Sequence, residues 1–195
     1  MPDENGDVAL MEKATKGFSL IELLVTVMVL AVLVSLAMPV IGQLDKRRLI
    51  GAAEAVYSEF QFAKSEAIKQ SRDMHVEVGD GADWCVGVTD KDDCDCTLPQ
   101  TNNNACTVSV FDVATDTEVE VLRTVRAEDH DGITVNTGTA FEVEFNSLRG
   151  MLNGVGNTVE LQSQDGRRLD VVVSRTGRVR LCGPNEPVGG YPQCN

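Results

Sequence analysis

A run of 24 residues, from Phe18 to Ile41, constrains this chain most. It reads FSLIELLVTVMVLAVLVSLAMPVI and contains one charged side chain, Glu22. A helix of that length is about 36 Å long, and the hydrocarbon core of a bilayer is about 30 Å thick. We therefore expect residues 18–41 to cross a membrane once, as a helix.

Glu22 distinguishes this segment from an ordinary membrane anchor. A charged carboxylate at the bilayer centre costs on the order of 2.5–3.5 kcal/mol, so an acidic residue there signals a function. The alternative is a cleaved secretory signal peptide, because Ser35-Leu36-Ala37 has the small-x-small pattern of a cleavage site. The run is, however, longer than the apolar core of a typical signal peptide.

Residues 17–23, GFSLIEL, closely resemble the prepilin motif of type IV pilins and type II secretion pseudopilins. This resemblance implies that a prepilin peptidase cleaves between Gly17 and Phe18, removes the leader 1–17 and methylates the new N-terminus at Phe18. It also implies that Glu22 pairs with the N-terminal amine of a neighbouring subunit, and two charges that are each costly in hydrocarbon become tolerable when paired. Pro39 stands where many family members carry a helix-kinking proline.

Beyond Gly42 the pattern becomes amphipathic. Apolar residues recur at spacings of three and four, at Leu49, Ala53, Val56, Phe60, Ala63 and Ala67. This spacing predicts a helical stripe that faces a core. The charged side chains off the stripe are expected to be solvated, namely Lys64, Glu66, Lys69 and Arg72. We predict one transmembrane and assembly helix over 18–72, and the alternative is two helices hinged at Pro39 or Gly42.

After Met74 the hydrophobic pattern changes to alternation. Alternating runs cover 74–78, 107–113, 119–125, 141–145, 159–161 and 169–173, and turn signals such as Asp165-Gly166 separate them. We predict six to nine short, mostly antiparallel strands, because the turns are too short for parallel crossovers. The expected fold class is α+β, with a long N-terminal helix packed on an antiparallel sheet or sandwich-like head over 73–195, as in pilins.

The chain has six cysteines, Cys85, Cys94, Cys96, Cys106, Cys182 and Cys194. An even number together with an export signal favours disulfides in an oxidising compartment. A zinc site is the less favoured alternative, because Cys94-Asp-Cys96 has one intervening residue and no second paired set exists. We favour Cys182 with Cys194, which bracket a short segment rich in Gly and Pro. The other four staple a cysteine-rich loop over 85–106, in an order that the sequence does not fix.

Two further segments narrow the resemblance. YSEFQFAKSEAIKQ (57–70) and VVSRTGRVRLC (172–182) are similar to segments of GspH pseudopilins and FimT/FimU minor pilins. The resemblance implies a subunit anchored in the bacterial inner membrane, with its head in the periplasm, that assembles with other pilins or pseudopilins near a filament tip. Secretion pseudopilin, with secreted proteins as partners, and minor pilin for pilus biogenesis both stay open.

A third possibility rests on residues 177–180, GRVR. On a strand, Arg178 and Arg180 point to one face, and Arg175, Arg167 and Arg168 could extend that patch. In FimT-like proteins such a segment is implicated in DNA uptake, and arginine suits phosphate because it donates in a planar fork. The alternative is an ordinary solvated strand face whose arginines are ion-paired.

Composition excludes other classes of function. With 30 Asp and Glu against 17 Lys and Arg, the formal charge of −13 argues against a protein coated for nucleic acid. The acidity is local: residues 75–145 hold sixteen acids and three bases, and residues 146–195 hold four and six.

We expect no enzyme, cofactor or metal. His75 and His130 accompany no recognisable nucleophile or metal-ligand spacing. The acidic loop 90–95 lacks the glycine and the distal glutamate of a calcium-binding EF-hand loop. Trp84 is expected to be a core anchor of the head.

Overall fold

The computed structural model describes residues 18–195, except for the side chains of 36–42. Gly17 and the predicted leader lie outside the described residues, and so does the side chain of Pro39, so the cleavage and the kink stay predictions. The chain divides into two compact units, residues 1–40 and 41–195. Helix α1 runs from Leu20 to Gln70. Within the described residues, no helix offers an apolar stretch long enough to cross a membrane.

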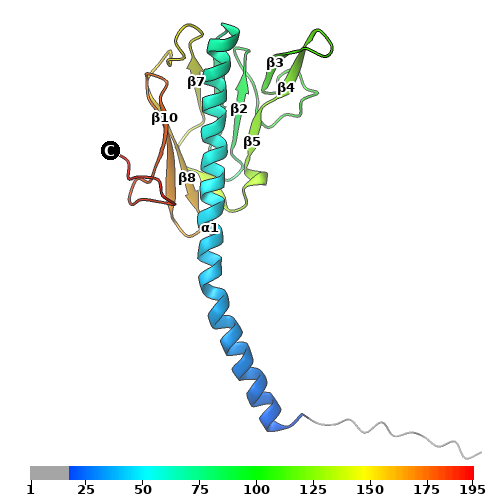
Figure 1. The fold of residues 1–195 in the computed structure, drawn as a ribbon, viewed down its shortest axis with the longest axis vertical. Coiled ribbons are helices and arrows are strands. Elements are labelled where there is room, and N and C mark those ends of the chain that lie inside the picture. Colours follow the sequence, from blue (N-terminus) through cyan, green and yellow to red (C-terminus); the bar gives the residue numbers. More distant parts are fainter. Residues whose placement is uncertain (1–17) are drawn as a thin grey trace, which may run out of the picture. The chain divides into compact units, whose positions relative to one another are not determined.

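The head packs on the stripe that the spacing predicts. All six stripe residues are fully buried, and they join a core of valine, leucine and aromatic side chains from the strands. The helix ends where Ser71 adopts a left-handed conformation with φ 53°, a common way to close a helix. Figure 1 shows the C-terminal half of α1 running across the strands of the head.

The prediction that Glu66 is solvated is wrong. Glu66 is 8% exposed, and its carboxylate accepts hydrogen bonds from Lys69 and Gln70. Gln70 also donates to the backbone oxygen of Ser109 at 3.0 Å. A β-hairpin thus lies over this end of the helix, which spacing along α1 alone does not reveal.

The described part of the head holds ten strands, one more than the upper limit predicted, and each strand pair there is antiparallel. One sheet has the order β5-β2-β1-β7, a second has the order β10-β9-β8-β6, and β3 and β4 form a separate hairpin. The bounds are β1 Met74–Val78, β2 Cys85–Thr89, β3 Thr107–Asp112, β4 Thr117–Leu122, β5 Thr124–Arg126, β6 Ile133–Val135, β7 Phe141–Phe145, β8 Asn157–Ser163, β9 Arg168–Val173 and β10 Val179–Cys182. The architecture is the predicted α+β one.

The prediction of a loop over the whole of 85–106 is wrong at its start. Residues 85–89 form β2, which is buried at all five positions and lies between β1 and β5. A strand covered on both faces does not alternate between apolar and polar residues, so its sequence lacks the signal by which the other strands are predicted. The predicted strand 119–125 is in turn divided at Arg123, where the chain leaves β3 and joins β2.

Three disulfides connect the six cysteines. Cys182 bonds to Cys194, as predicted. The pairs that the sequence leaves open are Cys85–Cys96 and Cys94–Cys106. Trp84 is 1% exposed and donates its indole N–H to the backbone oxygen of Ile133 at 2.9 Å, which confirms it as a core anchor.

Candidate functional site

The first candidate site is the N-terminal turn of α1. The backbone oxygen of Ser19 accepts hydrogen bonds from the N–H groups of Glu22 (3.0 Å) and Leu23 (3.1 Å), and these bonds start the helix. Glu22 therefore lies in the first turn. Its exposed carboxylate makes no hydrogen bond or ion pair with any residue that the structure describes. Phe18, the predicted mature N-terminus, is 81% exposed.

The helix that follows presents apolar side chains on every side. All described side chains from 18 to 35 are exposed, with Leu20 at 81% and Leu24 at 46%. A helix that is apolar all round is stable in a membrane or against other helices, and not in water. This stretch therefore requires lipid, neighbouring helices or both.

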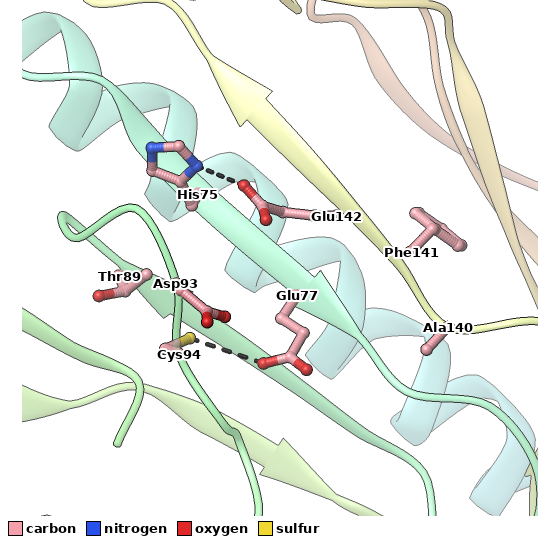
Figure 2. Close-up of a pocket in the computed structure, with 8 residues that line it drawn as sticks. All are labelled: His75, Glu77, Thr89, Asp93, Cys94, Ala140, Phe141 and Glu142. Atoms are coloured by element: carbon pink, nitrogen blue, oxygen red, sulfur yellow. Dashed lines mark hydrogen bonds and ion pairs between the residues drawn. The ribbon is translucent and has the colours of Figure 1, made fainter. Parts of the chain in front are cut away.

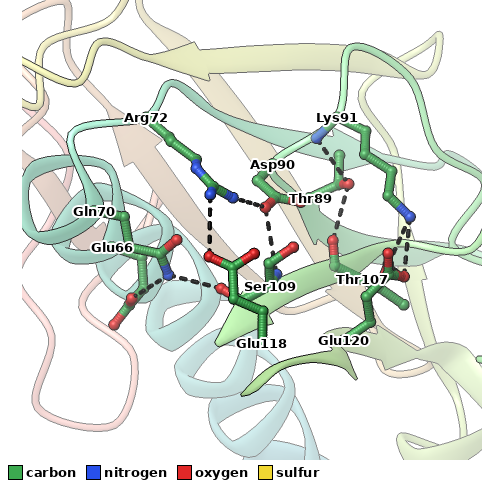
Figure 3. A network of polar contacts seen from close by, with 10 residues as sticks. All are labelled: Glu66, Gln70, Arg72, Thr89, Asp90, Lys91, Thr107, Ser109, Glu118 and Glu120. Atoms are coloured by element: carbon green, nitrogen blue, oxygen red, sulfur yellow. Dashed lines mark hydrogen bonds and ion pairs between the residues drawn. The ribbon is translucent and has the colours of Figure 1, made fainter. Parts of the chain in front are cut away.

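The second feature is a network of polar contacts that fixes the β3–β4 hairpin to the end of α1 (Figure 3). Arg72 contacts Asp90 at 3.0 Å and Glu118 at 3.3 Å. Lys91 contacts Glu120 at 3.0 Å. The pKa of Glu120 is lowered first by the hydrogen bond that its carboxylate accepts from Thr107, and second by the hydrogen bond from Lys91. The network holds the hairpin and the cysteine-rich segment in fixed positions.

Of the arginines predicted to form a patch, Arg180 lies on β10, at the edge of the second sheet. Arg175 and Arg178 lie in the turn segment before β10, so the prediction that Arg178 is on a strand is wrong. Arg175, Arg178 and Arg180 are exposed, and Arg180 donates to the backbone oxygen of Asn195 at 3.1 Å. The side chains of Arg175 and Arg178 contact no carboxylate among the described residues. The turn before β10 is fixed, because Lys64 of α1 donates to the backbone oxygen of Gly177 at 2.9 Å.

Arg167 and Arg168 do not extend this patch as free cations, so that expectation is wrong. Arg168 contacts Glu160 at 2.7 Å and Asp170 at 3.6 Å, and Arg167 contacts Asp165 at 2.8 Å. For these two arginines the alternative interpretation is correct, in which the arginines of the strand face form ion pairs with nearby carboxylates.

Arg149, which no sequence pattern assigns to the arginine patch, is also exposed. Its neighbour Gly150 packs closely against Gly177. A Cβ added at Gly177 would lie 1.9 Å from the backbone oxygen of Gly150. The backbone at Arg149 therefore lies close to the turn at Gly177, although the two residues are 28 positions apart in the sequence. No local pattern could reveal this contact.

The third feature is a pocket on the outer face of the first sheet (Figure 2). Its volume is about 230 Å³, and its lining residues are His75, Glu77, Thr89, Asp93, Cys94, Ala140, Phe141 and Glu142. His75 and Glu142 are hydrogen-bonded. Burial raises the pKa of Glu77, and the nearby charges of Asp95, Asp93 and Glu142 raise it further.

One set of groups in the described part of the chain has the spacing of metal ligands, namely Glu77, Cys94 and Cys106. The two sulfurs, however, are bonded to each other in a disulfide. A metal ion is bound by thiolates, and a disulfide offers none. These residues therefore do not fit a metal ion.

Comparison with known families gives two matches. Residues 52–177 match the family model described as type II transport protein GspH. Residues 13–38 match the prokaryotic N-terminal methylation motif. No curated protein matches the chain.

Among solved structures, the chain is similar to two crystal structures of the type IV minor pilin FimU from Pseudomonas aeruginosa strain PAO1. The first shares 19% identity over 74% of this chain and 96% of that chain, with a TM-score of 0.46. The second shares 20% identity over 73% of this chain and 100% of that chain, with a TM-score of 0.44. Because the GspH model covers more than half of the chain, the protein belongs to the type IV pilin-like GspH family, and it carries the N-terminal methylation motif of prepilins.

Proposed function

We propose that this protein is a minor pilin or pseudopilin that assembles through its N-terminal helix into a pilus or pseudopilus. The observation that carries this proposal is the first turn of α1, inside the methylation motif. There Glu22 is exposed at the start of an apolar helix and has no partner among the described residues. In this proposal the precursor spans the inner membrane once, with its head in the periplasm. A prepilin peptidase cuts between Gly17 and Phe18 and methylates Phe18.

Assembly follows from the cost of isolated charges in lipid. Glu22 and the free amine of a neighbouring subunit are each unfavourable alone in hydrocarbon and become tolerable as a pair. The pair forms at one axial offset between neighbouring helices, so it selects the register of the filament. The head then lies among other minor subunits, where it contacts partner pilins or, in a secretion pseudopilus, secreted proteins.

Replacement of Glu22 by glutamine tests the proposal. Removing one partner of a buried pair costs about 3–5 kcal/mol, so incorporation of Glu22→Gln into sheared filaments should fall by roughly two orders of magnitude or more. Asp116→Asn, which removes one charge from an exposed hairpin tip, serves as the matched control and should incorporate normally. Equal incorporation of Glu22→Gln and the unmodified chain would refute the pairing.

DNA binding is a second candidate, and the exposed arginines without carboxylate partners favour it. In this candidate Arg178 and Arg180 contact phosphates, and each lost contact lowers the salt slope of binding by about one. Arg178→Gln with Arg180→Gln should then abolish the salt-sensitive retardation of DNA by the full chain. Arg167→Gln, at an arginine paired with Asp165, should retain it. Absence of retardation by the unmodified chain at low salt would exclude this candidate.

A further inference from the structure

The segment that follows β10, residues 183–195, returns to the strand that it leaves, and we call it the strap. It contains no helix or strand. The Cys182–Cys194 disulfide joins the last residue of β10 to the far end of the strap. Gly183 donates its backbone N–H to the oxygen of Pro192 and accepts a hydrogen bond from the N–H of Cys194. The two ends of the strap are therefore held together at β10, and Figure 1 shows the strap in red beside that strand.

The middle of the strap lies against α1. Tyr191 donates its hydroxyl to a carboxylate oxygen of Glu54 at 2.5 Å. Val188 is 3% exposed and belongs to the hydrophobic core. Gly189 packs closely on Ile50, and a Cβ added at Gly189 would lie 2.2 Å from Cδ1 of Ile50. The strap is thus fixed at two places, to β10 by its disulfide and to α1 by these contacts.

The disulfide of the strap is the most accessible of the three. Cys194 is partly exposed, whereas the four cysteines of the other two disulfides are at most 6% exposed. Thiol–disulfide exchange requires a thiolate to reach one of the two bonded sulfurs. A reductant can therefore attack the strap disulfide while the other two disulfides stay covered.

We propose that the strap is redox-sensitive: reduction of the Cys182–Cys194 disulfide by a dithiol releases the strap from α1 and leaves the rest of the head folded. A thiolate of the dithiol attacks the sulfur of Cys194, and the thiolate of Cys182 leaves. The second thiolate of the reductant then displaces Cys194, so the reductant is oxidised to a disulfide. Both cysteines are reduced to thiols, and their two protons come from the two thiols of the reductant.

Release follows from the balance between chain entropy and a small number of contacts. The disulfide restricts the strap even when it is detached from α1, so the contacts with α1 offset only part of the entropy of ordering these residues. After reduction the same contacts must offset all of it. Release uncovers Ile50 and the core around Val188, so the reduced protein presents an apolar surface that the oxidised protein covers. The inference goes beyond the proposed function and does not depend on it, because the strap and α1 belong to one chain.

Selective reduction of the full-length protein in detergent micelles tests the proposal. The reductant is dithiothreitol at increasing ratios of its reduced to its oxidised form. N-ethylmaleimide then labels the free thiols, and peptide mass spectrometry identifies them. Cys182 and Cys194 should be labelled at ratios at which the other four cysteines are still disulfide-bonded. Hydrogen exchange of the reduced, unlabelled sample should be faster over residues 188–194 and unchanged over β1.

Two neighbouring glycines give a matched pair of variants. Gly189 and Gly190 both have positive φ, 62° and 97°, so alanine strains the backbone at either position. Only at Gly189 does the new methyl group meet α1, since a Cβ at Gly190 has nothing within 4 Å. Gly189→Ala should therefore be half-reduced at a several-fold lower ratio of reductant than Gly190→Ala. Tyr191→Phe, which removes the hydrogen bond to Glu54, should lower that ratio roughly tenfold relative to the unmodified chain, because hydrogen bonds to charged groups are strong.

Three results would overturn the proposal. One is labelling of all six cysteines at the same ratio of reductant. Another is half-reduction of Gly189→Ala and Gly190→Ala at equal ratios. The third is unchanged hydrogen exchange of the strap after reduction of the Cys182–Cys194 disulfide, because the strap would then stay on α1 without it.

Discussion

In the second sheet, the buried carboxylate of Asp170 destabilises the folded protein when it is ionised. It is 6% exposed, and its Oδ1 has no hydrogen-bond partner among the described residues. Burial raises its pKa to about 6, Arg168 opposes that rise, and Glu160, its cross-strand partner, adds to it. The difference from the ordinary value of 3.8 corresponds to about 3 kcal/mol. Because the folded state holds the proton more tightly, this cost is absent below pH 3.8 and is complete above about pH 6.

Asp170→Asn should therefore stabilise the protein in a pH-dependent way. Thermal melts of the full chain from pH 4 to pH 8 should show a higher Tm for the variant at pH 8 and nearly equal Tm values at pH 4. The exposed Asp116→Asn is the control and should follow the unmodified chain throughout. A Tm difference that does not change with pH would contradict the account of Asp170.

Gly87 is a position where only hydrogen fits. A Cβ there would lie 2.4 Å from the Sγ and 2.7 Å from the Cβ of Cys106, because the two disulfides of the cysteine-rich segment pack on β2. Gly87→Ala should cost about 1–3 kcal/mol of unfolding free energy through overpacking. Gly51→Ala, in α1 with nothing within 4 Å of the new methyl group, should instead gain up to about 1 kcal/mol. Equal denaturation midpoints for the two variants would contradict this packing.

At the scale of elements, an ion pair attaches α1 to the junction of β4 and β5. Arg123 donates to Glu59 at 2.8 Å and lies 4.1 Å from the centroid of the Phe62 ring. Burial raises the pKa of Glu59, and the charge of Arg123 opposes that shift. The Glu59 carboxylate is 8% exposed, so it depends on this partner.

Arg123→Ala should destabilise the head by roughly 3 kcal/mol, because it leaves a buried carboxylate unpaired. Adding Glu59→Gln should restore part of that loss, since the amide carries no charge. Chemical denaturation of both single variants and the double variant measures the coupling. Additive effects, with no recovery in the double variant, would show that the pair does not hold the helix to the head.

What the sequence could predict depends on the range of the interactions. The stripe from Leu49 to Ala67 is a local pattern, and each of its residues is buried as expected. β2 could not be predicted because both of its faces are buried, so apolar and polar residues do not alternate along it. The burial of Glu59 and Glu66 depends on partners such as Arg123 and Ser109, which lie far away in the chain. The opposition of Glu77 and Glu142 likewise required strand register.

At the scale of the whole molecule, two parts of the chain have opposite solvent requirements. Residues 18–35 expose apolar side chains all round, and the unit 41–195 encloses a continuous core. The first part carries the apolar surface proposed for assembly, and the second carries the acidic pocket and the exposed arginines of β10 and the turn before it. The net charge of −13 is a sum over the whole chain, so it describes neither the acidic pocket nor the exposed arginines.

Processing between Gly17 and Phe18, on which the proposed assembly depends, can be read from the N-terminus of the mature protein. The protein should be expressed with a prepilin peptidase, isolated from membranes and analysed by intact and peptide mass spectrometry. The mature chain should begin at Phe18 and carry one methyl group on its amine. A chain that begins after Ala37, or that retains the leader 1–17 in the presence of active peptidase, would contradict this processing.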